Sequence, residues 1–329
     1  MVRLLEVSEL TVHFETDRGE VQALDKVNLY LDKGEVLALV GESGSGKTTL
    51  GRAILNVIPF PEGKIIEGRI LFQGRSLLEM QEEECNAVIR GKAITLIPQD
   101  PFGSANPLFT LGTQLRDIFK ASRDDGREME KKMVDLLTQL QLPDAGELLC
   151  KYPHELSGGQ LQRMMIAASL LPAPSLIIAD EPTTSLDVTV EAQILYLIRK
   201  MVKERGVSVL FITHNLAVAS KISDRIIVMY AGQVMESSPT SVLFSETAHP
   251  YARKLLECLP NPEGTIKDIG GMVPNLINPP KGCRFHPRCE EAEPPCFSKR
   301  PTLTQIAAEH WVSCHNPVGR GRSPWTERS

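Results

Sequence analysis

The sequence has no long apolar run, no excess of basic residues and few aromatic residues. Its longest nearly apolar stretch, Met164 to Leu171, is less than half of the roughly 18 to 20 residues that a membrane-spanning helix needs. Its 36 Lys and Arg face 41 Asp and Glu, which gives a formal charge of −5 at pH 7. We therefore expect a globular chain that neither crosses a membrane nor binds nucleic acid.

A secretion signal and a disulfide framework are also not expected. The first residues reach a carboxylate at Glu6, too early for the apolar core of a signal peptide. We accordingly expect a cytosolic chain whose membrane role, if it has one, comes through a partner. In that compartment the seven cysteines are not expected to form disulfides, and clustered cysteines indicate a metal.

Short apolar runs alternate with amphipathic helical patterns, which is typical of an α/β domain with a mostly parallel sheet. A more alternating pattern from Leu4 to Phe14 predicts a half-exposed antiparallel strand. Between residues 100 and 170 helix-forming sequence dominates, so we expect a helical subdomain there. The predicted buried strands are 36–40, 94–97, 176–179, 209–212 and 226–229.

The last part of the chain differs in composition. Eleven of the 23 prolines and four of the seven cysteines lie beyond residue 259. Residues 281–329 also carry eight Lys and Arg against five Asp and Glu. We therefore divide the chain into an α/β domain, 1–240, and an irregular appendage, 241–329.

Residues Gly41 to Thr48 form a phosphate-binding motif. The sequence GESGSGKT matches G-x-x-x-x-G-K-[ST], follows a predicted strand and opens a predicted helix. Its glycines allow successive N–H groups to face an anion at the positive end of the helix. Lys47 is expected to neutralise phosphate charge, and Thr48 to offer its hydroxyl to Mg²⁺. The predicted nucleotide-binding residues here are Ser43, Gly44, Ser45, Gly46, Lys47, Thr48 and Thr49.

Polar side chains follow three other predicted strands, where open α/β sheets bind ligands. Asp180 is placed to hold Mg²⁺, and the adjacent Glu181 to deprotonate a water that attacks the γ-phosphate. Gln99 can complete the Mg²⁺ shell, and His214 can donate to the phosphate as charge develops. Together with Lys47 these residues predict a site for ATP hydrolysis.

The sequence Leu156-Ser-Gly-Gly-Gln160 adds the motif that identifies a family. With the phosphate loop, Gln99, Asp180-Glu181, Ser185-Leu186-Asp187 and His214 in this order, residues 1–240 resemble an ATP-binding cassette (ABC) ATPase. The resemblance implies a P-loop NTPase of the ABC type with an antiparallel β subdomain and a helical subdomain.

The resemblance also implies that two such domains enclose two ATP molecules. Ser157, Gly158, Gly159 and Gln160 of one subunit would then complete the site of the other. Asp187 would contact the opposite subunit, and Phe14 would stack on adenine.

Further stretches, including Gln99-Asp-Pro101 and His249-Pro-Tyr251, resemble ATPase subunits of dipeptide, oligopeptide and nickel importers. This resemblance implies two membrane permeases, a second homologous ATPase or a second copy of the chain, and an extracytoplasmic binding protein. The chain would lie peripherally at the cytoplasmic face of the membrane.

Four cysteines of the appendage, Cys283, Cys289, Cys296 and Cys314, lie within 32 residues. No close C-x₂₋₄-C pair, the usual mark of structural zinc, occurs among them. Their wide spacing favours a larger group such as a [4Fe–4S] cluster, which similar tails in this importer branch hold. Zn²⁺ remains an alternative because His286 and His315 lie nearby, and unligated thiols are a third.

Two other functions compete with the importer subunit. A soluble ABC ATPase that acts on nucleic acid or ribosomes is disfavoured by the acidic charge and by the single cassette. A nucleotide-sensing module without turnover would lack a working base at Glu181.

Overall fold

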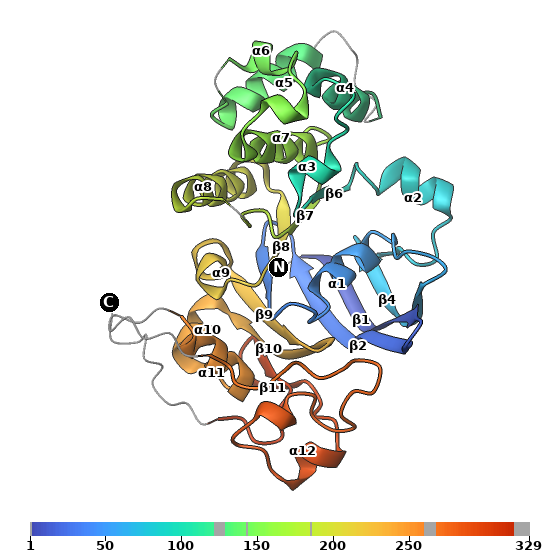
Figure 1. Ribbon diagram of the computed structural model, residues 1–329, viewed down its shortest axis with the longest axis vertical. Coiled ribbons are helices and arrows are strands. Elements are labelled where there is room, and N and C mark those ends of the chain that lie inside the picture. Colours follow the sequence, from blue (N-terminus) through green and yellow to red (C-terminus); the bar gives the residue numbers. More distant parts are fainter. Residues whose placement is uncertain (1, 122–128, 143, 185, 260–267, 319–329) are drawn as a thin grey trace. The chain divides into compact units, whose positions relative to one another are not determined.

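The computed structural model describes residues 2–121, 129–142, 144–184, 186–259 and 268–318 (Figure 1). Its contacts divide the chain into two compact units. The first unit comprises Met1–Asp32, Val36–Glu79 and Phe211–Ser329, and the second comprises Lys33–Glu35 and Met80–Leu210. These units do not follow the division at residue 240, which stays a prediction about domains.

The first unit contains an antiparallel sheet in the order β2-β1-β4-β5. Alternate residues of β1 such as Leu5, Val7, Leu10 and Val12 are buried, interrupted by register shifts against β2. The antiparallel β subdomain is thus confirmed, although only its first strand was predicted. The bounds are β1 Arg3–Thr16, β2 Gly19–Asp32, β4 Gly63–Phe72 and β5 Arg75–Ser76.

The strands of the second sheet that belong wholly to the first unit lie in the order β11-β12-β10-β9-β3. β3 runs parallel to β9, and all five residues of β3 are buried, as its continuous apolar sequence predicts. The strands are β3 Val36–Val40, β9 Arg225–Tyr230, β10 Gln233–Pro239, β11 Thr304–Ala307 and β12 His310–Val312. The helices are α1 Lys47–Ile54, α9 Leu216–Ile222, α10 Thr240–Glu246, α11 Pro250–Glu257 and α12 Pro294–Ser298, with a 3₁₀ turn at His286–Arg288.

One hydrophobic core joins this second sheet to the cysteine-containing segment. Ala38 of β3 and Val228 of β9 belong to the same buried cluster as Leu256 of α11, Phe285 and Cys296. The C-terminal residues therefore complete the core that supports β3, the strand that leads into the phosphate loop.

The second unit is mainly helical around one parallel strand pair, β6 with β7 (Figure 1). Among its described residues from 101 to 170 there are helices and no strands, as the predicted helical subdomain requires. Its strands are β6 Ile94–Ile97 and β7 Leu176–Asp180, and β8 Ser208–Thr213 begins here and ends in the first unit. Its helices are α2 Glu82–Val88, α3 Pro101–Ser104, α4 Leu111–Ala121, α5 Met129–Gln139, α6 Ala145–Leu148, α7 Gly158–Leu170 and α8 Val188–Arg205. Within the described ranges, every helix is too short or too polar to span a lipid bilayer.

Candidate nucleotide and cysteine sites

The phosphate loop connects β3 to α1, and glycine is required at both of its ends. A Cβ atom on Gly41 would lie 2.1 Å from the carbonyl oxygen of Met229. Gly46 has a φ of +97°, and its Cβ would lie 2.7 Å from the carbonyl oxygen of Ala23. Between them Ser43 and Gly44 are exposed. The loop is thus packed tightly at its base and open at its tip, where an anion would approach the first N–H groups of α1.

The Lys47 side chain lies along this loop. Its Nζ donates to the carbonyl oxygens of Gly41 at 2.8 Å and Glu42 at 3.0 Å, and to Ser45 Oγ at 3.2 Å. The residue is 6% exposed, so its charge is held close to the loop in a poorly solvated position. This geometry suits the predicted role of Lys47 in neutralising phosphate charge.

Phe14 and His214 also belong to the first unit. Phe14 is half-buried on β1, where it pairs with Val21 of β2 and Gly63 of β4. His214 is exposed directly after β8, and the side chain of Asn215 then caps α9 by accepting from the N–H groups of Ala217 and Val218. Their roles at adenine and at the γ-phosphate stay predictions.

In the second unit the ends of β6 and β7 bring Gln99 and Glu181 together. Glu181 Oε2 accepts from Gln99 Nε2 and from Thr184 Oγ1, both at 3.0 Å. Glu181 has a φ of +46°, a left-handed conformation that is costly for a residue with a Cβ and recurs at functional sites. Asp180, the last residue of β7, is 9% exposed. The two adjacent acids thus differ in environment, as their alternation along a strand predicts.

The Ser157-Gly-Gly-Gln160 motif forms the beginning of α7. Ser157 Oγ accepts from the Gln160 N–H at 3.3 Å, and Gln160 Oε1 accepts from the Ser157 N–H at 3.0 Å. This capping box holds the turn rigid while Ser157 stays exposed. A Cβ on Gly159 would lie 3.1 Å from Val190 Cγ1 of α8. The motif is therefore a fixed, accessible helix N-terminus with donors suited to phosphate.

Asp187 has a local role that the sequence did not reveal. Its Oδ1 accepts from the N–H groups of Thr189 at 3.0 Å and Val190 at 2.9 Å and so caps α8. The residue is exposed, and a contact with an opposite subunit stays a prediction. Ser185 lies outside the described residues.

The four predicted cysteine ligands are free thiols that influence one another. Burial, with the nearby Cys296 and Cys289 adding to it, raises the pKa of Cys283 to about 11. Burial also raises the pKa of Cys314 to about 12, and the other three cysteines contribute. The N–H of Cys283 donates to the carbonyl oxygen of Cys296 at 2.9 Å. Cys283, Cys289, Cys296 and Cys314 thus share one neighbourhood of the first unit.

The arrangement of these thiols bears on what they could hold. Among the described residues, no three His, Cys, Asp or Glu side chains are placed to hold a single metal ion. A zinc ion needs sulfur atoms about 2.3 Å from one centre, so the thiols as placed do not form a zinc site. Four thiolates are the usual ligands of a [4Fe–4S] cluster, but among the described residues only the shared neighbourhood of the four thiols bears on it, and the cluster stays a prediction.

Three residues whose contacts form part of these sites were not predicted. Thr184 bonds Glu181, and its position three residues later in the same turn could have indicated this. Tyr251 and Arg288 both contact Glu42 of the phosphate loop, across 209 and 246 residues of sequence. No local sequence pattern predicts contacts between residues so far apart in the sequence.

A strand, a phosphate loop at a helix start and a Ser-Gly-Gly turn that caps another helix define an ATP-binding cassette protein. Residues 24–184 match the family model described as ABC transporter, and residues 235–296 match oligopeptide/dipeptide transporter, C-terminal region. The chain belongs to the ATP-binding subunits of peptide ABC transporters.

Individual relatives agree with this assignment. The chain is 43% identical to the oligopeptide transport ATP-binding protein OppD of Bacillus subtilis, over 95% of this chain and 88% of OppD. It is 37% identical to the dipeptide transport ATP-binding protein DppD of Escherichia coli, over 98% and 99%. Among solved structures, the dimeric ATP-binding cassette MJ0796 bound to ADP and Pi matches with a TM-score of 0.64 and 28% identity, covering 72% of this chain and 98% of that one.

Proposed function

We propose that the protein is the ATP-hydrolysing subunit that energises import of dipeptides or oligopeptides through a membrane permease complex. The observation that carries this function is the phosphate loop, with Lys47 drawn along it, in a chain whose C-terminal region matches that of peptide transporters. The peptide cargo itself is supported by the relatives OppD and DppD, which are oligopeptide and dipeptide transport ATP-binding proteins.

We assign ATP binding mainly to residues of the first unit. The backbone N–H groups from Ser43 to Thr49 would surround the β- and γ-phosphates, and Lys47 would neutralise their charge. Phe14 would stack on the adenine ring. We assign the Mg²⁺ ligands to Thr48, Gln99 and Asp180, whose hydroxyl, amide and carboxylate oxygens are donors that Mg²⁺ accepts. Bound Mg²⁺ would offset charge on the phosphate oxygens.

Hydrolysis is assigned to Glu181 and His214. Glu181 would orient a water and take its proton, and the two hydrogen bonds to its Oε2 hold the carboxylate in a defined direction. His214 would donate a hydrogen bond to the γ-phosphate as charge develops in the transition state.

We further assign Ser157, Gly158, Gly159 and Gln160 to the site of a neighbouring ATPase, either a homologous subunit or a second copy. The support is an exposed helix start that its capping box holds rigid. The positive end of this helix would attract a phosphate presented from another surface. Asp187, exposed at the start of α8, would contact the same neighbour. ATP would thus close two subunits together, and hydrolysis would release them.

The membrane partners are two permease subunits. Three apolar side chains in the stretch after Gln99 are candidates for this contact: Phe102, Leu108 and Phe109 are 47%, 79% and 51% exposed. Exposed apolar side chains grouped in this way are typical of a protein contact. The chain would then lie at the cytoplasmic face of the membrane, and the extracytoplasmic binding protein would act on it only through the permeases.

The importer function is tested by reconstitution. The chain expressed with its permeases and partner ATPase should purify in detergent as one complex, and its ATPase rate in vesicles should rise when peptide-loaded binding protein is added. Purification without permeases, together with nucleic acid that survives a high-salt wash, would instead support the nucleic-acid alternative.

For the cysteines we propose a [4Fe–4S] cluster held by Cys283, Cys289, Cys296 and Cys314. The support is that the four free thiols lie in one neighbourhood, as the four thiolate ligands of a single cluster must. Protein purified without oxygen should be brown, absorb at about 400 nm, and contain iron and sulfide in equal amounts. Colourless protein with one bound Zn²⁺ would establish the zinc alternative.

A further inference from the structure

The segment that joins Cys283 to Cys289 packs against the phosphate loop. Three of its side chains, Arg284, Phe285 and Arg288, reach the loop or the residues that hold it. All three belong to the same compact unit as the loop. The cysteine segment is thus a structural neighbour of the nucleotide site.

The most direct of these contacts is made by Arg288. Its Nη1 donates to Glu42 Oε2 at 2.8 Å, and the two side chains are 5% and 25% exposed. Three of the other four N–H donors of Arg288 also bond: Nη1 donates to Tyr230 Oη, Nε to the Gly270 carbonyl, and Nη2 to the Ile269 carbonyl at 2.7 Å. A guanidinium held on several sides positions Glu42 firmly.

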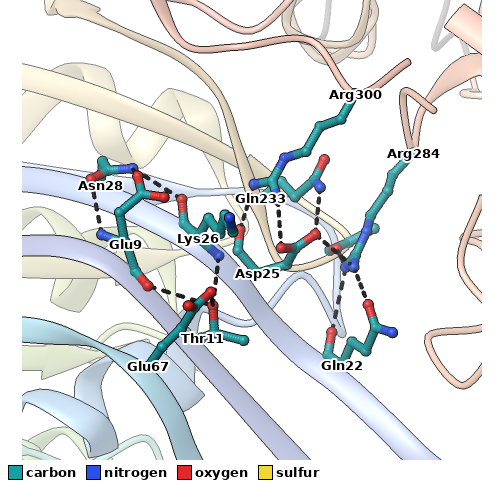
Figure 2. A network of polar contacts seen from close by, with 11 residues as sticks. Glu9, Thr11, Gln22, Asp25, Lys26, Asn28, Glu67, Gln233, Arg284 and Arg300 are labelled. Atoms are coloured by element: carbon teal, nitrogen blue, oxygen red, sulfur yellow. Dashed lines mark hydrogen bonds and ion pairs between the residues drawn. The ribbon is translucent and has the colours of Figure 1, made fainter. Parts of the chain in front are cut away.

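A second contact runs through Arg284, which is 2% exposed. Its Nη1 donates to the Ala231 carbonyl at 2.5 Å, and its Nη2 donates to Asp25 Oδ2 at 2.9 Å (Figure 2). The next residue, Gly232, donates its N–H to the Ser45 carbonyl of the phosphate loop at 3.0 Å. Arg284 therefore fixes the turn that carries one of the loop's backbone hydrogen bonds.

A third contact runs through aromatic rings. Phe285 is fully buried, and the centroid of its ring lies 5.2 Å from the ring centroid of Tyr251 and 5.3 Å from that of Tyr230. The hydroxyl of Tyr251 accepts from the backbone N–H of Glu42 at 3.1 Å. Displacement of Phe285 would remove a neighbour that holds this hydroxyl in place.

We propose that residues 284–288 form a clamp that positions the phosphate loop. We further propose that nucleotide affinity depends on Cys283 and Cys289, the cysteines at the two ends of this segment. The physical reason is preorganisation: a loop that is already held in its binding conformation loses less conformational entropy when it binds phosphate. Cys283 and Cys289 flank the clamp, and Cys283 is also tied to Cys296 by a backbone hydrogen bond. Arg288 is a positioning residue, since it acts through Glu42.

The proposal rests on the ATPase function and is tested by nucleotide affinity rather than by turnover. Binding of a fluorescent ATP analogue with Mg²⁺ is measured on the full chain, purified without oxygen. Arg288→Ala should weaken binding by about fivefold to thirtyfold, and Glu42→Gln by a similar factor. The double variant should be no weaker than either single variant, because both changes remove the same contact. In the assembled transporter Arg288→Ala should raise KM for ATP with little change in kcat.

Two further variants separate the clamp from general damage. Arg253→Ala is the matched control, because Arg253 pairs with Glu291 of the same C-terminal region. The nucleotide affinity of this variant should equal that of the wild-type chain. Arg288→Lys should recover part of the affinity lost in Arg288→Ala. Cys289→Ser should weaken binding as Arg288→Ala does, with no further loss when the two are combined.

Each failure has a distinct meaning. Wild-type affinity in Arg288→Ala and Glu42→Gln, or strictly additive effects, would refute the clamp. Wild-type affinity in Cys289→Ser would refute the dependence on the cysteines. A wild-type chain that binds no nucleotide would refute the ATPase function itself.

Discussion

Removal of the Asp25 carboxylate should destabilise the first unit strongly. Asp25 on β2 accepts from Gln233 Nε2 at 2.8 Å, from Arg284 Nη2 at 2.9 Å and from Arg300 (Figure 2). Arg284 is 2% exposed, so Asp25→Ala would leave a buried guanidinium without its counter-charge. Breaking a buried pair from one side costs about 3 kcal/mol or more.

That cost corresponds to a fall in melting temperature of roughly 4 °C for a chain of 329 residues. The assay is thermal unfolding followed by circular dichroism. Glu15→Ala is the control, because Glu15 and its partner Lys64 are 64% and 49% exposed and should contribute little. An Asp25→Ala protein as stable as wild type would refute the view that these arginines hold the C-terminal segment on β2.

The contribution of Asp25 to stability can also be tested by lowering the pH. Burial alone would raise the pKa of Asp25, but Arg284 foremost, then Gln233 and Arg300, hold it below its ordinary value of 3.8. The folded state therefore favours the charged carboxylate. Its contribution to stability is complete above pH 3.8 and is lost as the pH falls through the lower folded pKa.

Three further changes test other parts of the structure. Glu181→Gln should abolish phosphate release while ATP binding persists, and unchanged turnover would remove Glu181 as the base. Gly41→Ala should abolish nucleotide binding because its Cβ meets the Met229 carbonyl at 2.1 Å, whereas Gly146→Ala, which meets nothing within 4 Å, should bind normally. Burial lowers the pKa of His249 to about 3, so stability should fall from pH 6.5 toward 3 as the unfolded chain takes up a proton. His249→Asn, which can still cap α11, should flatten that dependence in urea unfolding at pH 7 and pH 5; equal slopes would contradict it.

Much of the fold followed from local patterns. The continuous apolar run of β3 gave its strand bounds, since a strand covered on both faces is apolar throughout. The glycines of the phosphate loop indicated its tight backbone conformation from the sequence alone. Strand β2, by contrast, has a mixed pattern, and its register shifts against β1 disrupt the simple alternation from which a strand is predicted.

The unpredicted parts of the site depend on distant contacts. The excess of basic residues after residue 280 suggested a locally positive appendage, but Arg284, Arg288 and Arg300 are turned inward onto Asp25 and Glu42. Nothing near them in the sequence distinguishes them from solvated arginines. Their pairing is decided by tertiary packing of the C-terminal segment onto the first unit.

We propose that a triphosphate held by Lys47 is hydrolysed only when the Ser157 turn of a neighbouring subunit reaches it. The most direct measurement compares Ser157→Arg with Lys47→Ala, both as the isolated chain and in the assembled transporter. We predict that Ser157→Arg loses ATPase activity in the complex yet binds ATP like wild type as an isolated chain, whereas Lys47→Ala loses both. A Ser157→Arg complex that hydrolyses ATP at the wild-type rate would contradict the account.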